Sequence, residues 1–188
     1  MLYLASQSPR RYQLLKQLGL DFKQFSITVD ESVLANEKPV DYSKRITLLK
    51  LEEAKKHLAD TDIVITSDTS VVIGDEILGK PKDFDDAKVM LEKLSNNVHY
   101  VYTSVAVSKN DQTLIKNTIN KVSFRSISEK EIIAYWQSNE PKDKAGSYAI
   151  QGLGGIFVKS ISGSYSAIMG LPLYETVNLL KKFGVEVL

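Results

Sequence analysis

The order of strand-like and helix-like segments is the feature of this sequence that most limits its fold. Apolar runs predict strands over residues 2–5, 25–29, 63–65, 71–73, 76–78, 99–107 and 114–124. Apolar residues at helical spacing predict helices over residues 8–19, 39–58, 83–94, 128–136 and 172–183. Because strands and helices are interleaved, we expect one α/β unit over residues 1–188, with a mixed sheet flanked by helices.

Some details of this expectation concern single residues. Gly74-Asp75 lies between two apolar runs and predicts a hairpin with a two-residue loop. In the helix over 39–58, we expect Ile46, Leu49 and Ala54 to face the core. The segment 146–170 is rich in glycine and is expected to be irregular.

Composition restricts the chemistry that this chain can perform. There is no cysteine, which excludes disulfides, thiolate nucleophiles and cysteine-ligated metals. The two histidines, His57 and His99, argue against a multi-histidine metal site or a histidine-based triad. A formal net charge of +1 argues against a general nucleic-acid coat. Any catalysis must therefore use carboxylates, lysines, arginines and hydroxyl groups.

Apolar runs in this sequence are short. None approaches the roughly 20 residues needed to cross a bilayer, and residues 1–6 lack the features of a signal peptide. We therefore expect a soluble, cytoplasmic protein with neither a membrane nor a nucleic acid as its partner.

The first candidate site is the segment from Ser6 to Arg11. Ser8 fits the N-cap of the helix and Pro9 its first position, so free backbone N–H groups would point out of the helix start. Arg10 and Arg11 lie beside the positive end of the helix dipole, which is unfavourable unless an anion joins them. A strand, a serine-rich turn and a helix N-terminus favour a phosphate site. The alternative is a solvated arginine pair on a surface helix.

The second candidate site is centred on Asp68, which follows the apolar segment 63–65. The end of a buried strand is a common position for a metal ligand or base in α/β enzymes. The hairpin register would place Thr69 opposite Lys80 and would bring Asp68 near the segment 79–81. A carboxylate and a lysine beside a phosphate site suit phosphoryl chemistry. The alternative is a structural Asp turn with a surface lysine.

Three further residues are weaker candidates when taken alone. Glu31 follows the strand-like segment 25–29 and could supply a second carboxylate to a divalent ion. Lys50 lies among leucines, and either extends along the apolar surface or points into a cleft. Gln151 offers both a hydrogen-bond donor and an acceptor, as reading a base edge requires. Each of them is otherwise typical of a solvated surface or loop.

A series of short motifs occurs in order along nearly the whole chain. They are Leu4-Ala5-Ser6-Gln7-Ser8-Pro9-Arg10-Arg11, Val29-Asp30-Glu31, residues 42–45 with Lys50, Ser67-Asp68-Thr69, Gly79-Lys80-Pro81, Glu140-Pro141 through Gly152, Gly163-Ser164-Tyr165, and Gly170-Leu171-Pro172-Leu173. Together they resemble the Maf (septum-formation) family of nucleoside triphosphate pyrophosphatases. The segment 143–152 is similar to the branch that acts on dTTP and UTP.

The resemblance implies a fold, a ligand and roles for individual residues. The implied fold is a strongly twisted mixed sheet in two lobes around a central cleft, similar to that of the ITPases, usually in a homodimer. The implied cofactor is a divalent cation, Mg²⁺ or Mn²⁺. The implied roles are proton acceptor for Asp68, metal contact for Glu31 and Asp68, substrate binding for Ser6, Arg11, Lys50 and Lys80, and substrate choice for Arg10, Thr69 and Gln151.

The resulting hypothesis is attack of water on the α-phosphorus of a pyrimidine nucleoside triphosphate such as dTTP or UTP, which yields the monophosphate and pyrophosphate. One alternative is a pyrophosphatase for another, modified nucleotide. The other is a regulator of cell division or septum formation that binds a nucleotide or a protein without turnover. The presence of both Asp68 and Glu31 favours an enzyme, because a binding module has no need of that pair.

Overall fold

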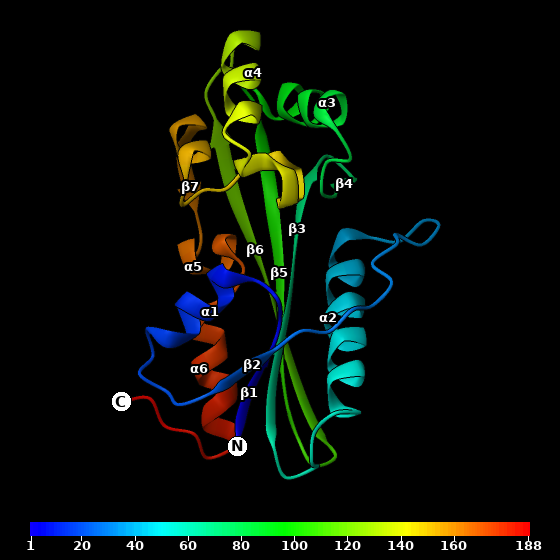
Figure 1. The fold of residues 1–188 in the computed structure, drawn as a ribbon, viewed down its shortest axis with the longest axis vertical. Helices are drawn as coiled ribbons and strands as arrows, with labels where there is room; N and C mark the ends of the chain where they lie inside the picture. Colours follow the sequence, from blue (N-terminus) through cyan, green and yellow to red (C-terminus); the bar gives the residue numbers. More distant parts are fainter.

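A computed structural model describes residues 1–188, in which seven strands form one mixed sheet (Figure 1). The strand order is β2-β1-β3-β5-β6-β7, with β4 paired to β3 beside this path. The strands are β1 (Leu2–Ala5), β2 (Lys23–Phe25), β3 (Ile63–Ile73), β4 (Glu76–Leu78), β5 (Val98–Lys109), β6 (Gln112–Phe124) and β7 (Val158–Ser162). β1 is parallel to β2 and β3, and all other pairs are antiparallel. The expected mixed α/β sheet is confirmed.

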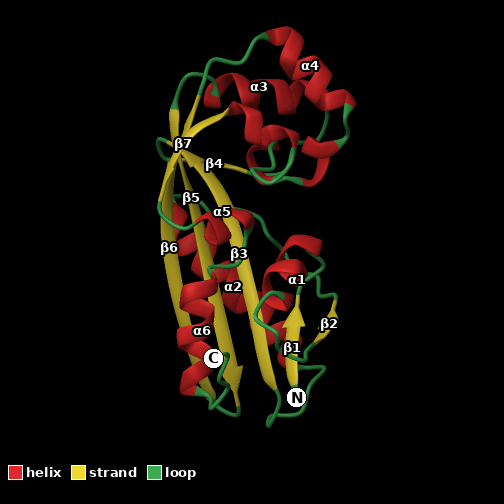
Figure 2. Cartoon of the chain, turned by 90° about the vertical axis from the view of Figure 1, so that its left-hand side faces the viewer, coloured by secondary structure: helices red, strands yellow, loops and turns green.

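Helices cover both faces of the sheet. They are α1 (Pro9–Lys16), α2 (Pro39–Lys55), α3 (Phe84–Leu94), α4 (Glu129–Gln137), α5 (Tyr165–Met169) and α6 (Leu173–Lys182), with short 3-10 helices η1 (Glu140–Asp143), η2 (Ala145–Ser147) and η3 (Leu153–Phe157). α2 packs on one face and α6 on the other, whereas α3 and α4 gather at one end of the long strands (Figure 2). No helix combines the length and apolar character that a membrane span requires.

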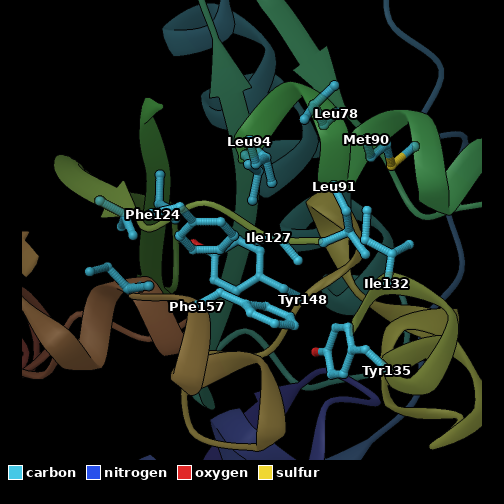
Figure 3. Packing of buried hydrophobic residues seen from close by; sticks show 14 residues of the cluster. Leu78, Met90, Leu91, Leu94, Phe124, Ile127, Ile132, Tyr135, Tyr148 and Phe157 are labelled. Atoms are coloured by element: carbon cyan, nitrogen blue, oxygen red, sulfur yellow. The ribbon is translucent and has the colours of Figure 1, made fainter. Parts of the chain in front are cut away.

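The hydrophobic interior is divided into two lobes. The cluster at the α3–α4 end contains Val71 of β3, Val101 of β5 and Val122 of β6, and Figure 3 shows its packing around Phe124 and Tyr148. A second cluster, at the other end of the same strands, is formed with α1 and α6 and includes Leu14, Ile65, Val105, Leu171 and Leu180. The lobes therefore share the sheet, with β3, β5 and β6 running through both.

One edge of β3 is open in its middle. β1 pairs with residues 63–65 of β3, β4 pairs with residues 71–73 of the same edge, and β5 pairs along the opposite edge. Residues 66–70 therefore have a strand neighbour on one side only. The gap lies between the two lobes.

β3 is longer than the sequence pattern indicates. The apolar segment 63–65 was expected to end before Asp68, but the strand continues through five polar residues. Their side chains satisfy their hydrogen bonds inside the protein: the Thr66 hydroxyl donates to Thr47 O at 3.0 Å, and the Ser67 hydroxyl to Ser104 O at 2.7 Å. Asp68 thus lies within a strand, and the expectation that it follows one is wrong.

Three other local expectations are wrong. The strand expected over 25–29 ends at Phe25, because its partner β1 ends at Ala5 and Ser6 N–H makes a final bond to Phe25 O at 3.0 Å. Leu49 is 40% exposed, whereas Ile46 and Ala54 are buried as expected. The segment 146–170 is not wholly irregular, since it contains η3, β7 and α5.

Candidate active site

A cleft of about 580 Å³ lies between the two lobes, beside the open edge of β3. It is lined by β1 and the start of α1, the segment 27–31, Lys50 of α2, the middle of β3, Lys80 and the segment 143–151. Every candidate residue from the sequence lines it: Ser6, Arg10, Arg11, Glu31, Lys50, Asp68, Thr69, Lys80 and Gln151. Residues separated by up to 145 positions in the chain thus meet in one cavity.

Lys50 connects the two carboxylates of the cleft. Its Nζ donates to Asp68 Oδ1 at 2.8 Å and lies 2.7 Å from Glu31 Oε1. The Lys50 side chain is only 12% exposed, so of the two alternatives from the sequence the structure shows the lysine that points into a cleft. Tyr42, which lies in the motif 42–45 but was not a predicted site residue, supports Glu31 by donating from its hydroxyl to Glu31 O at 2.9 Å.

The charge around Glu31 favours its ionised form. Burial acts to raise the pKa of Glu31, but Lys50, Lys80 and Arg11 outweigh it, and the pKa is lowered. All three cations therefore lower the pKa of Glu31. Lys80, although exposed, is one of them.

Arg11 links three parts of the chain. The Ser8 hydroxyl caps α1 by accepting from the Arg11 N–H at 3.4 Å, as the sequence predicts. The guanidinium donates from Nε to Gly170 O at 2.8 Å, from Nη1 to Ser6 Oγ at 3.3 Å and from Nη2 to Thr69 Oγ1 at 3.3 Å. Burial lowers the pKa of Arg11, although an arginine still remains protonated in a protein.

Hairpin geometry brings Lys80 to the cleft. The register of β3 and β4 is the one that the Gly74-Asp75 loop predicts, with Val71 paired to Leu78. Pairing ends at Leu78, so Thr69 and Lys80 do not form a ladder pair. Gly146 N–H donates to Gly79 O at 3.0 Å, which holds the segment 143–151 next to Lys80.

Arg10 of α1 and Gln151 also line the cleft. Burial lowers the pKa of Arg10, while Asp143 and Glu140 act in the opposite direction. Gln151 is exposed, and Tyr148, Ala149 and Ile150 before it also line the cleft. All three lie inside the motif that ends at Gly152, but none of them was a predicted site residue.

The oxygen donors of the cleft fit a hard divalent cation that is bound together with phosphate. Mg²⁺ is usually held by one or two carboxylates and by substrate phosphates, with waters in the remaining positions. Glu31 and Asp68 offer two carboxylates that converge on one point, the Nζ of Lys50. The chain has no group of three or more His, Asp or Glu residues placed to hold a metal ion. The fit is therefore to a cation that shares its ligands with a phosphate-bearing molecule.

Comparison with known proteins assigns the chain to a family. The model of the family described as Maf-like protein matches residues 1–183. The chain belongs to the Maf family. This Maf-family chain is 53% identical to a dTTP/UTP pyrophosphatase of Pseudoalteromonas translucida, with 96% of each chain covered. It is 48% identical to the dTTP/UTP pyrophosphatase of Hahella chejuensis (99% and 94% covered) and 50% identical to that of Vibrio cholerae (97% of each).

Solved structures include more distant neighbours of this Maf-family chain. The Staphylococcus aureus Ham1 protein superposes with a TM-score of 0.48 at 16% identity, covering 65% of this chain and 71% of its own. A nucleoside-triphosphatase, dITP/XTP pyrophosphatase, from Mycobacterium abscessus superposes with a TM-score of 0.40 at 14% identity, covering 65% and 73%.

Proposed function

We propose that this Maf-family chain is a nucleoside triphosphate pyrophosphatase that hydrolyses dTTP and UTP to the monophosphate and pyrophosphate. The observation that carries the proposal is the Asp68–Lys50–Glu31 cluster, in one cleft with Arg11 and the start of α1. Relatives 53% and 50% identical to it are named dTTP/UTP pyrophosphatase. The same activity in this chain explains why cations and carboxylates converge here.

The cations of the cleft bind the triphosphate. Arg11 and Lys80 reach the cavity from opposite lobes, and Lys50 reaches it from α2. The N-terminus of α1, after Ser8, adds partial positive charge, as helix N-termini do in many phosphate sites. Ser6, whose hydroxyl already accepts from Arg11 and from Ser8 N–H, completes this phosphate-binding end.

Asp68 acts on the attacking water. Its carboxylate accepts the water proton as the oxygen bonds to the α-phosphorus, and the bond from that phosphorus to the bridging oxygen of the β-phosphate breaks to release pyrophosphate. Lys50 orients this carboxylate through the 2.8 Å bond to Oδ1. Glu31 and Asp68 would hold a divalent cation, Mg²⁺ or Mn²⁺, which when bound supplies further charge neutralisation on the triphosphate. Arg10, Thr69 and Gln151 select the base.

We also propose how the protein works as a whole. Residues 1–188 act as a single domain, which the continuous sheet through both lobes supports. The resemblance to the Maf family supports a homodimer in the cytoplasm. The formal net charge of +1, with cations concentrated at one cleft, suits a small polyanion such as a nucleoside triphosphate better than a nucleic acid.

A nucleotide panel tests the proposed function. The protein is incubated with dTTP, UTP, dCTP, CTP, ATP and GTP in the presence of Mg²⁺ or Mn²⁺, and pyrophosphate and phosphate are measured separately. We expect pyrophosphate release to be fastest with dTTP and UTP. Release of phosphate in its place contradicts attack at the α-phosphorus, and binding without turnover favours the regulatory alternative.

Asp68→Asn tests the assignment of the proton acceptor. We expect turnover of dTTP to fall about 10²–10³-fold, by analogy with the loss of one electrostatic partner in other enzymes. Asp111→Asn, in the exposed β5–β6 turn, is the matched control and should keep wild-type turnover. An Asp68→Asn protein that folds and keeps its turnover rules out this role.

A further inference from the structure

One carboxylate fixes the end of the loop that we define as residues 149–155, which carries Gln151 and whose last three residues begin η3. Glu140 Oε1 accepts a hydrogen bond from the Gly154 N–H at 2.9 Å, and Oε2 accepts one from the Leu153 N–H at 2.9 Å. Oε1 also accepts from the Tyr135 hydroxyl at 2.6 Å. Two backbone groups that follow Gln151 are therefore bound to the side chain of Glu140.

Tyr135 fixes the beginning of the same loop. Its hydroxyl accepts a hydrogen bond from the Ala149 N–H at 3.1 Å while it donates to Glu140. The tyrosine itself is held in place, because its ring packs edge-on against the ring of Phe157 in the core of the α3–α4 lobe (Figure 3). The two ring centroids are 5.1 Å apart. Gln151 thus lies between two anchor points that belong to one Tyr135–Glu140 pair.

Glycines allow the loop to lie against this pair. A Cβ at Gly152 would lie 2.0 Å from Glu140 Oε2, and one at Gly154 would lie 2.5 Å from the Tyr135 hydroxyl. Neither position has room for a side chain without displacing an anchor. The glycine spacing of the loop therefore matches its contact with the Tyr135–Glu140 pair.

The charge of Glu140 strengthens these bonds. Burial acts to raise its pKa, but hydrogen bonds from Tyr135, Gly154 and Leu153 outweigh burial, and the pKa is lowered. Glu140 is therefore ionised at neutral pH, and hydrogen bonds to an ionised acceptor are about twice as strong as neutral ones. By contrast, Gln151 itself is exposed on the cleft wall.

We propose that Glu140 and Tyr135 are positioning residues for base selection: they hold the loop 149–155 so that Gln151 meets the base of the bound nucleotide. The inference rests on the proposed function and deepens it. Neither residue reaches the triphosphate cluster around Lys50, so the pair acts on which nucleotide is chosen and leaves the attack on phosphorus to Asp68.

A selectivity ratio tests this proposal. We compare kcat/KM for dTTP with kcat/KM for dCTP, because the two bases present opposite hydrogen-bonding groups at the edge that Gln151 would read. We expect Glu140→Gln and Tyr135→Phe each to lower the ratio about five- to tenfold, as the loss of one hydrogen bond would. Tyr135→Phe keeps the packed ring, so it carries the test if Glu140→Gln does not fold. Glu92→Gln on the exposed side of α3 is the control.

A double-mutant comparison separates positioning from general stability. If Glu140 acts through Gln151, adding Glu140→Gln to Gln151→Ala lowers the ratio no further, because the two changes remove the same interaction. A lowered Tm with an unchanged ratio, or losses that multiply in the double variant, would overturn the proposal. A wild-type protein that releases no pyrophosphate from dTTP contradicts the proposed function. An active wild-type protein whose selectivity ratio is unchanged in the variants contradicts only the positioning role.

Discussion

Asp68 and Thr69 are consecutive residues of β3, and their side chains lie on opposite faces of the sheet. Asp68 contacts Lys50 of α2, whereas the Thr69 hydroxyl accepts hydrogen bonds from Arg11 of α1 and from Thr103 of β5, both at 3.3 Å. Because this edge of β3 has no strand neighbour, the cleft reaches both faces. Two adjacent residues therefore belong to separate hydrogen-bond networks, and a substitution can be aimed at either one.

Thr69→Val tests the network on the α1 face. Valine has nearly the same shape but cannot accept the bond from Arg11, which keeps its contacts to Gly170 O and Ser6. Thr103 loses its contact to Thr69 as well but keeps its hydrogen bond to Ala167 O at 2.8 Å. We therefore expect kcat/KM for dTTP to fall about five- to tenfold, as for the one lost hydrogen bond to Arg11. Thr61→Val, at an exposed turn, should have no effect. A loss as large as that of Asp68→Asn would show that the networks are not separate.

Lys50→Met tests the network on the α2 face. Without the ammonium group, the Glu31 and Asp68 carboxylates face each other with no shared partner. We expect kcat/KM for dTTP to fall about 10²–10³-fold. The pKa of Glu31, followed by NMR titration, should rise, since Lys50 is the strongest of its attractive partners. Lys44→Met, on the exposed side of the same helix, is the control. Unchanged kinetics together with an unchanged pKa would contradict the role of Lys50.

His99 should make stability depend on pH. Burial lowers the pKa of His99 to about 4, against a usual value of about 6.5. Between these values the unfolded chain binds more protons than the folded one, so the free energy of unfolding falls as pH falls from about 6.5 to about 4. The full effect is on the order of 3 kcal/mol. Urea unfolding at a series of pH values measures it.

Two histidine variants isolate this effect. His99→Gln should remove most of the slope between these pH values, whereas His57→Gln should keep it, because the His57 side chain is 60% exposed. Equal slopes in all three proteins would show that the pKa of His99 is not lowered by folding.

Gly146→Ala should destabilise the α3–α4 lobe. Gly146 has a φ of +65°, and a Cβ there would lie 2.7 Å from Val71 Cγ1. Gly184→Ala is the matched control, since its φ is +77° but no atom lies within 4 Å of the added Cβ. We expect the control to lose about 1 kcal/mol from backbone strain alone, and Gly146→Ala to lose clearly more. Equal Tm values for the two variants would argue against the close contact.

Features that depend on neighbouring residues were predictable from the sequence. Ser8 caps α1 and the Gly74-Asp75 loop sets the register of β4, both as expected, and the Ser-x-x-Glu pattern of Ser128 and Glu131 likewise forms a capping box. In each case the bonding partners lie within a few positions of each other, so the local pattern contains the whole signal.

Features that depend on distant partners were not predictable in this way. The polar middle of β3 is a strand because Thr66 and Ser67 bond to α2 and β5. β7 has no clear apolar alternation and exists through pairing with β6. Glu31 and Lys50 resembled ordinary surface residues, since the ion pairs that join them to Asp68 span 19 and 18 positions in the chain. From the residues alone they were weak candidates, and the resemblance to a family gave them roles in the site.

β3, β5 and β6 join the two lobes without a break, and this has a mechanical consequence for the cleft. Domains connected by a flexible linker rotate freely, whereas separating these lobes would require distortion of a hydrogen-bonded ladder. The span from the arginines of α1 to Gln151 is thus set by the curvature of the sheet before any ligand arrives. A ligand that binds across the cleft must be as long as that span. The length of the ligand and its hydrogen bonds therefore both decide whether it fits.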